Sequence, residues 1–183
     1  SNGELASGGR NLFYHYNSHR YLLNYLEDFD PAELQIYKCR VNLESASIPA
    51  NTSIVRAIEN HDRKRIASYT DSKQIALNVL AYSFFTKGPS FVYRDEENGQ
   101  KHTPSLFDKD TVEWANDKET YELYKKLVDL KHREKNKELL QTILDQERTT
   151  SIKATNGYKD GKEEIGLFSL NPAGVFVPVE QGK

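Results

Sequence analysis

The sequence predicts an α/β fold in which helices connect short parallel strands, followed by a small antiparallel β unit. Segments 12–16, 54–58 and 90–93 are short, apolar and rich in branched or aromatic residues, as in strands buried within a parallel sheet. Longer segments with apolar residues at helical spacing separate them. After residue 149 the pattern changes to alternating segments divided by turn residues, which is typical of antiparallel strands.

Composition limits the classes of protein and partner. A chain of 183 residues can bury one core, with room for a small appendage. Its 25 basic and 27 acidic residues leave a formal charge of −2, which argues against a nucleic acid or an anionic membrane as partner. Cys39 is the sole cysteine, so neither an intrachain disulfide nor a zinc site is predicted. No apolar stretch approaches the ~18 residues of a membrane span and no signal peptide is visible, which favours a cytoplasmic over a secreted location.

The start of the chain predicts a linker, a strand and two helices. Residues 1–10 are rich in Gly and Ser and are interpreted as a linker or tag remnant. The chain contains no Met, which indicates an N-terminus that is not native. A strand at 12–16 leads into a loop, and apolar spacing then predicts a helix over 20–28. A second helix begins at Pro31, behind an Asp that suits the N-cap, and fades near 45–49.

The middle of the chain predicts a strand, a buried helix and another strand. The turn 51–53 precedes the strand at 54–58. A helix capped within 70–72 runs to Thr86, and its residues are apolar on nearly every side, which predicts that it is buried. Lys, Gly and Pro at 87–89 end this helix before the strand at 90–93.

The last third predicts one more helix and a small β domain. The helix follows Asn116 and Asp117, the charged run 131–137 is interpreted as a solvated helix face or turn, and helical periodicity resumes at 138–144. Three alternating strands are then expected, at 149–154, 164–170 and 174–179, with breaks at Asn156-Gly157, Asp160-Gly161 and Asn171-Pro172. We therefore expect a first domain over 11–135 and a partial β domain over 136–183.

Residues 59–62 carry the most chemical information. They read Glu-Asn-His-Asp and follow the strand at 54–58. In a barrel of parallel strands, the loops at the carboxyl ends converge on one mouth, where the chemistry takes place. A carboxylate beside an imidazole can hold two adjacent sugar hydroxyls, and its charge favours a developing oxocarbenium ion. The plain alternative is an Asp that caps the following turn beside a surface His.

Two segments resemble glycoside hydrolase family 13, the α-amylase family. Residues 59–65 (Glu-Asn-His-Asp-Arg-Lys-Arg) look like its fourth conserved region, at the end of barrel strand seven. Residues 81–93, with Glu96 and 104–110, resemble its last barrel repeat, in which a helix ending in Gly-x-Pro leads to strand eight. The resemblance implies a partial (β/α)8 TIM barrel, strands six to eight, followed by a small, incomplete antiparallel β domain.

The resemblance also implies residue roles and a substrate. Asp62 corresponds to the third catalytic carboxylate, which stabilises the transition state. His61 would bind hydroxyls of the sugar at the cleavage site, and Arg65 lies at a motif arginine, which we take as substrate-binding. Tyr14 and His15 can face the same mouth, without an assigned role. The parent enzyme would cleave or transfer α-glucosidic bonds of an α-glucan or maltooligosaccharide by double displacement. No cofactor or metal ligand is evident, although the resemblance allows a structural calcium in the parent protein.

Other features of the family are missing from the sequence. It has neither the Gly-x-Arg-x-Asp pattern of the nucleophile nor a convincing general acid. Glu4 is the nearest imitation of the acid, but only eight residues separate it from Phe13, and a parallel crossover needs at least ~10. Because retaining glycosidases need two carboxyl groups ~5–5.5 Å apart, the chain alone is expected to be inactive. Arg94 stands where relatives often have Gly, so the outer binding subsites are expected to differ.

Two rival hypotheses stay open. A non-catalytic carbohydrate-binding or interaction module on an amylase-like scaffold would bind sugar without hydrolysing it. An unrelated α/β domain would make the match a coincidence, and Asp62 would then point away from any mouth formed by strand ends. Half a barrel would also leave strand edges unpaired, so we expect an oligomer that covers them or further residues in the native protein.

Overall fold

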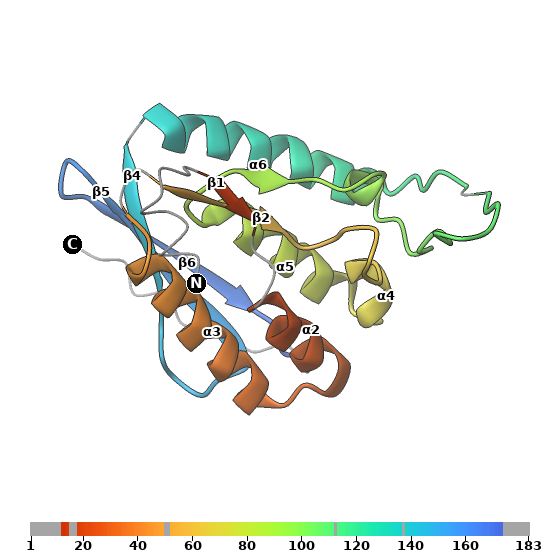
Figure 1. The fold of residues 1–183 in the computed structure, drawn as a ribbon, viewed down its shortest axis with the longest axis horizontal. Coiled ribbons are helices and arrows are strands. Elements are labelled where there is room, and N and C mark those ends of the chain that lie inside the picture. Colours follow the sequence, from red (N-terminus) through yellow and green to blue (C-terminus); the bar gives the residue numbers. More distant parts are fainter. Residues whose placement is uncertain (1–11, 15–17, 50–51, 112, 137, 174–183) are drawn as a thin grey trace.

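The computed structural model describes residues 12–14, 18–49, 52–111, 113–136 and 138–173, and these form two sheets with helices around them (Figure 1). One sheet has three parallel strands and the other has three antiparallel strands. Figure 1 shows α6 along one side of the molecule and α2 and α3 along the other, with both sheets between them. The predicted α/β class, with a parallel sheet followed by an antiparallel one, is confirmed.

The parallel sheet has the strand order β1-β2-β3, with β2 in the centre. Its strands are β1 (Leu12–Tyr14), β2 (Ser53–Ala57) and β3 (Ser90–Phe91), within or next to the predicted segments. Residues 15 and 16 of the first predicted segment, and the linker predicted at 1–10, lie outside the described residues. Tyr14 pairs with Val55, so the ends of β1 and β2 lie side by side.

The helices predicted over 20–28, from Pro31, from 70–72 to Thr86 and after Asp117 are present. The first connection contains α2 (His19–Asp28) and α3 (Pro31–Ala46), and the second contains α4 (Ile66–Tyr69) and α5 (Lys73–Phe85). A single 3₁₀ turn, η1 (Glu96–Asn98), precedes α6 (Lys118–Asn136), which includes most of the charged run 131–137. Among the described residues, no helix is long and apolar enough to cross a membrane.

Local chemistry explains where these helices begin and end. The Asp30 side chain accepts a hydrogen bond from the backbone N–H of Ala32 at 2.9 Å, so it caps α3 as predicted. Gly88 lies between the end of α5 and the start of β3 and has a φ angle of +106°, a backbone region that favours glycine. A Cβ atom at this position would lie 2.2 Å from the carbonyl oxygen of Ile54, so only glycine lets the connection pass so close to β2.

The antiparallel sheet consists of β4 (Leu139–Leu144), β5 (Ser151–Tyr158) and β6 (Glu163–Ser169). The helical periodicity predicted at 138–144 is wrong, because these residues form β4 and pair with β5. The predicted strand at 174–179 lies outside the described residues. Apolar spacing over seven residues fits a helix or a strand about equally well, and pairing with a neighbouring strand decided the outcome.

The break predicted at Asn156-Gly157 is also wrong, because both residues lie inside β5. The side chain of Asn156 is fully buried, donates to the carbonyl of Phe85 at 2.8 Å, and accepts from the hydroxyl of Thr142 at 2.6 Å. These tertiary hydrogen bonds satisfy the Asn side chain, which in isolation favours a turn. The actual turn is at Asp160-Gly161, where Gly161 has φ +80°.

The antiparallel sheet packs on the helices of the parallel sheet and shares one apolar core with them. The Tyr82 ring of α5 meets the Phe168 ring of β6 edge to face, with centroids 5.6 Å apart. The Tyr25 hydroxyl of α2 donates to the carbonyl of Leu170 at 2.8 Å. Aromatic pairs and a satisfied buried hydroxyl both stabilise such a junction, so the two sheets fold around a common centre.

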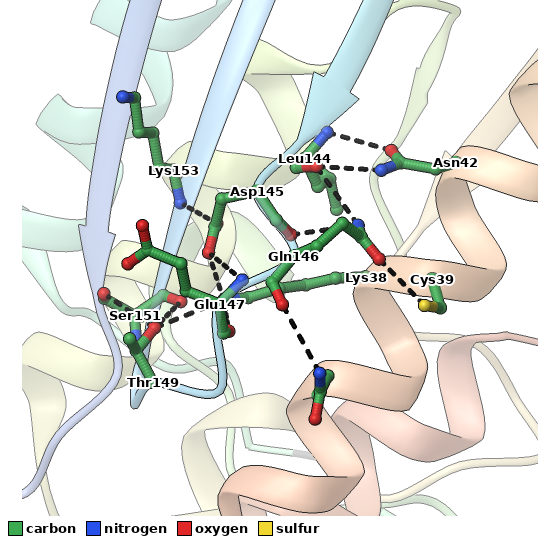
Figure 2. A network of polar contacts seen from close by, with 11 residues as sticks. Lys38, Cys39, Asn42, Leu144, Asp145, Gln146, Glu147, Thr149, Ser151 and Lys153 are labelled. Atoms are coloured by element: carbon green, nitrogen blue, oxygen red, sulfur yellow. Dashed lines mark hydrogen bonds and ion pairs between the residues drawn. The ribbon is translucent and has the colours of Figure 1, made fainter.

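A buried lysine fixes α3 to the connection between β4 and β5 (Figure 2). The Lys38 side chain is fully buried, and its ammonium lies 2.7 Å from Asp145 Oδ2. It also donates to the carbonyl of Glu147 at 3.0 Å and to the hydroxyl of Thr149 at 3.2 Å. All three donors of the ammonium are therefore used, as a buried cation requires.

Removal of the Asp145 carboxylate should destabilise this junction strongly. In Asp145→Ala the buried ammonium of Lys38 loses its counter-charge, which should lower the free energy of unfolding by about 3 kcal/mol or more. Urea unfolding followed by far-UV circular dichroism measures this change. Asp160→Ala is the matched control, because Asp160 pairs with Lys162 on the exposed hairpin and should change stability little. Equal stability loss in both variants would contradict the structural role of Lys38.

Candidate active site at the carboxyl end of β2

Residues 59–62 follow the central strand β2 and divide into a buried and an exposed pair. Glu59 and Asn60 are 3% and 7% exposed, whereas the side chains of His61 and Asp62 are 61% and 46% exposed. The carboxyl end of β2 therefore presents a carboxylate and an imidazole to solvent, as the sequence predicts. Polar side chains in this position suit recognition of a solute rather than packing.

His61 and Asp62 lie beside each other. The Nε2 atom of His61 is 3.3 Å from Oδ1 of Asp62. The second carboxylate oxygen and the other ring nitrogen are then available for a further partner, because each group has more than one hydrogen-bonding atom. The pair can thus hold neighbouring hydroxyl groups of a sugar through hydrogen bonds.

Asn60 shapes the loop that carries this pair. Its Oδ1 atom accepts from the backbone N–H of Asp62 at 2.9 Å, which is an Asx turn. Its Nδ2 atom donates to the Tyr14 hydroxyl at 3.2 Å, and the Tyr14 ring meets Phe91 edge to face at 6.3 Å between centroids. Contacts from β1 and β3 thus support the Asp62 loop on β2. The sequence left Tyr14 without a role, since only strand pairing brings it here, and His15 lies outside the described residues.

Arg65 lies beneath the loop and is 1% exposed. Its Nε atom is 3.1 Å from Glu59 Oε2, as an ion pair without an aligned hydrogen bond, and its Nη2 atom donates to the carbonyl of Arg94. The guanidinium also lies over the Tyr93 ring, 4.9 Å from its centroid. A substrate-binding role for Arg65 stays a prediction, and the contacts seen here join the Asp62 loop to the chain after β3.

A second buried carboxyl group, that of Glu96, completes this charged cluster. It accepts hydrogen bonds from the Tyr124 hydroxyl of α6 and from the backbone N–H of Tyr93, the latter at 2.9 Å. Burial raises the pKa of Glu59 to about 7, against the opposing charge of Arg65. Burial, together with the charge of Glu59, raises the pKa of Glu96 to about 8. Two carboxyl groups share one guanidinium, so the cluster retains a proton near neutral pH.

The buried cluster borders a cavity that is separate from the exposed pair. This cavity has a volume of about 160 Å³ and is lined by Glu59, Glu96 and Tyr124, with residues of α4, α5 and the start of α6. Neither His61 nor Asp62 lines it, so the candidate sugar site is the open surface above the loop. Within the described part of the chain, no group of three His, Cys, Asp or Glu side chains is placed to hold a metal ion.

In β/α barrel enzymes the active-site residues lie at the carboxyl ends of the parallel strands. The structure is similar to a crystal structure of an alpha-amylase from Lactobacillus plantarum, at a TM-score of 0.74 and 27% identity. The match covers 93% of this chain and 39% of that one. The resemblance to α-amylase-family glycoside hydrolases predicted from the sequence is confirmed.

Two further structures share the fold. A maltogenic alpha-amylase from Thermotoga neapolitana matches at a TM-score of 0.71 and 19% identity, over 87% of this chain and 38% of that one. A cyclic alpha-maltosyl-(1→6)-maltose hydrolase from Arthrobacter globiformis, in complex with maltose, matches at 0.67 and 15% identity, over 85% and 36%. The chain thus spans less than two fifths of the length of each of these enzymes. No model of a known protein family and no curated protein matches the sequence.

The buried carboxyl pair should make the protein less stable as pH rises. Folding raises the pKa of Glu59 and Glu96 above the ordinary value of 4.5, so the folded chain binds more protons than the unfolded chain. Their contribution is present at acid pH and is lost as pH rises through about 7 to 8. Glu96→Gln removes one of these titrations, and its stability should therefore fall less steeply with pH than that of the wild type.

Urea unfolding from about pH 5.5 to about pH 8.5 measures both slopes. Glu163→Gln serves as the control, because Glu163 lies at the exposed start of β6 and should leave the slope unchanged. Identical slopes in the wild type and Glu96→Gln would show that the carboxyl pair does not retain its proton.

Proposed function

We propose that the chain is the C-terminal part of the catalytic barrel of an amylase-like glycosidase, with part of the β domain that follows. The parent enzyme acts on α-glucosidic bonds of starch-type oligosaccharides by a retaining double displacement. The observation that carries this proposal is the exposed pair of His61 and Asp62 at the carboxyl end of the central parallel strand. The similarity to the Lactobacillus plantarum alpha-amylase supports it.

In this proposal Asp62 stabilises the transition state and His61 holds the sugar. Cleavage of a glycosidic bond develops positive charge on the sugar ring, and a nearby carboxylate lowers the energy of that charge. The imidazole of His61 binds hydroxyls of the same sugar and fixes it beside Asp62. Only carboxyl and imidazole groups take part, so we propose no cofactor for this step.

Arg65 supports the site from below. The resemblance makes it a substrate-binding residue, but its guanidinium is buried against Glu59 and the Arg94 carbonyl. We therefore favour a positioning role, in which Arg65 joins the Asp62 loop to the chain after β3. A substrate-binding role would need the guanidinium to leave both partners, which would cost the buried ion pair.

The chain by itself should not hydrolyse glucans. Double displacement needs a nucleophile and an acid/base on opposite sides of the bond, ~5–5.5 Å apart. The sequence lacks the family patterns for both, so we propose that further polypeptide supplies them. The enzymes with matching folds are more than twice as long as the segment that this chain covers, which is consistent with that proposal.

The outer face of the parallel sheet supports a partial barrel, strands six to eight. Apolar side chains on or beside this face are unusually exposed, with Leu12 at 58%, Tyr14 at 39%, Phe91 at 41% and Val92 at 40%. Strands β1 and β3 also lie at the two edges of the sheet. Exposed apolar patches and free strand edges favour association, so we propose that further strands cover this face, either from the parent protein or from a second copy.

A second candidate function is a carbohydrate-binding or interaction module without catalysis. The exposed His61–Asp62 pair can bind sugar hydroxyls whether or not a nucleophile is nearby. This alternative and the parent enzyme share the ligand class, an α-glucan or maltooligosaccharide. They differ in whether adding the rest of a barrel produces hydrolysis.

A chimera tests the catalytic role of Asp62. The matching segment of the Lactobacillus plantarum alpha-amylase is replaced with this chain, and release of reducing sugar from maltoheptaose is measured. We expect activity in the chimera, none in the 183-residue chain, and a loss of at least about 10²-fold in kcat for Asp62→Ala, because the transition state loses its carboxylate. Asp160→Ala, at an equally exposed carboxylate of the hairpin, should retain full activity.

The outcomes separate the two functions. Saturable binding of maltoheptaose to the chimera that weakens in Asp62→Ala, without hydrolysis, would favour the binding module. A folded chimera in which Asp62→Ala changes neither binding nor hydrolysis would exclude both.

The exposed sheet face should make the isolated chain self-associate. Because a second copy can cover the apolar side chains of β1 and β3, we expect a dimer or larger oligomer in size-exclusion chromatography with light scattering. Phe91→Glu places a charge in the centre of this face and should shift the mass toward that of a monomer. A wild-type chain that is a monodisperse monomer would contradict the proposal that this face needs a cover.

A further inference from the structure

A second polar cavity lies at the opposite, amino end of the parallel sheet. It has a volume of about 210 Å³ and is lined by the start of β2, the chain after α3, Lys87 and part of β4. A liquid water molecule takes about 30 Å³, so there is room for a polyatomic ligand. Nothing in the candidate glycosidase chemistry uses this end of the sheet, where residues of β/α barrels usually serve stability.

Arg56 is the central feature of this cavity. Its side chain is 6% exposed, and its Nε and Nη1 atoms are buried. Neither atom makes a hydrogen bond, and no carboxylate pairs with Arg56 in the part of the chain that the structure describes. A guanidinium stays protonated at any ordinary pH. A buried cation without a partner is costly, and its donor fork suits a bidentate oxyanion.

The other lining residues point to the same ligand class. The Thr52 hydroxyl is also buried and lacks a hydrogen-bond partner, and Thr52 is 1% exposed. Lys87 adds a second cation, and the remaining polar lining is uncharged, with Gln141 as an example. No acidic residue is among the described residues that line the cavity. Among the described lining residues there are thus two basic side chains, a hydroxyl and no carboxylate, and this composition favours an anion.

The carboxylate of Glu44 also acts in this region. Its charge and that of Arg56 both act on the buried hydroxyls of Tyr37 and Tyr82, in opposite directions. Glu44 is engaged by the Ser18 hydroxyl at 2.9 Å and does not line the cavity. The positive field of Arg56 toward the cavity therefore has no direct counter-charge within it.

We propose that the Arg56 cavity binds a small oxyanion, with inorganic phosphate as the representative ligand. The anion accepts hydrogen bonds from the guanidinium of Arg56 and from the Thr52 hydroxyl once both side chains turn toward it, because their unpaired atoms are buried in the present conformation. A bound anion would join the start of β2 to β4, and so would fasten the two sheets together at this end. The proposal does not depend on the glycosidase function, because Asp62 lies at the other end of β2.

Thermal unfolding of the 183-residue chain tests this site. Sodium phosphate is titrated at constant ionic strength with sodium chloride, and sulfate and acetate are titrated in parallel. We expect a saturable rise in Tm of roughly 5–10 °C at a phosphate concentration about one hundred times Kd. A response to phosphate and sulfate alone would define a tetrahedral oxyanion site, and a response that includes acetate would extend it to carboxylates. Both results support the proposal.

Variants identify the site. Arg56→Met should abolish the phosphate response, and Arg148→Met, at an exposed arginine, should keep it. Thr52→Val removes one hydroxyl with little change in shape, so it should fold and bind phosphate about 3–10-fold more weakly in isothermal titration calorimetry. It therefore tests the site even if Arg56→Met does not fold. The absence of a saturable response to all three anions would overturn the proposal, as would unchanged phosphate affinity in Thr52→Val together with Arg56→Met.

Discussion

The buried ion pair between Glu59 and Arg65 is the interaction on which the candidate active site depends. Glu59 also accepts a hydrogen bond from the backbone N–H of Ile66 at 2.8 Å, so the carboxylate closes the loop between β2 and α4 from inside. Through Arg65 the same contact reaches the Arg94 carbonyl after β3. Glu59 and Arg65 are buried, whereas the side chains of His61 and Asp62 in the same loop are exposed to solvent. A charge-bearing loop at a strand end needs such an anchor to present its side chains in a fixed geometry.

The buried Glu59–Arg65 pair also affects how the stability of the protein depends on pH. Glu96 is buried beside Glu59, and one guanidinium cannot neutralise two carboxylates at once. Burial raises the pKa of both carboxyl groups, and the charge of Glu59 raises that of Glu96 further, so the cluster retains a proton near neutral pH. Because Glu59 and Glu96 titrate in the neutral range, the free energy of unfolding depends on pH there. Apolar packing alone would not produce this dependence.

The parallel sheet has different chemistry at its two ends and on its outer face. Its carboxyl end presents the Asp62 carboxylate, its amino end encloses the Arg56 guanidinium, and its outer face exposes apolar side chains such as Phe91. In most folded proteins a buried cation is paired and a large apolar patch is covered. Both features therefore point to partners, an anion in one case and polypeptide in the other.

The sequence by itself determined the helices, the three parallel strands and the position of the His61–Asp62 pair, because local spacing, caps and breakers specify these directly. Only the tertiary structure decided that 138–144 is a strand and that Asn156 lies inside one, since each depends on a partner distant in sequence. The same holds for the site. Residues 59–62 are consecutive, so the sequence alone predicts that they lie together after β2. The contacts of Tyr14 with Asn60 and of Glu96 with Tyr124 join separate elements, and only the packing of those elements creates them.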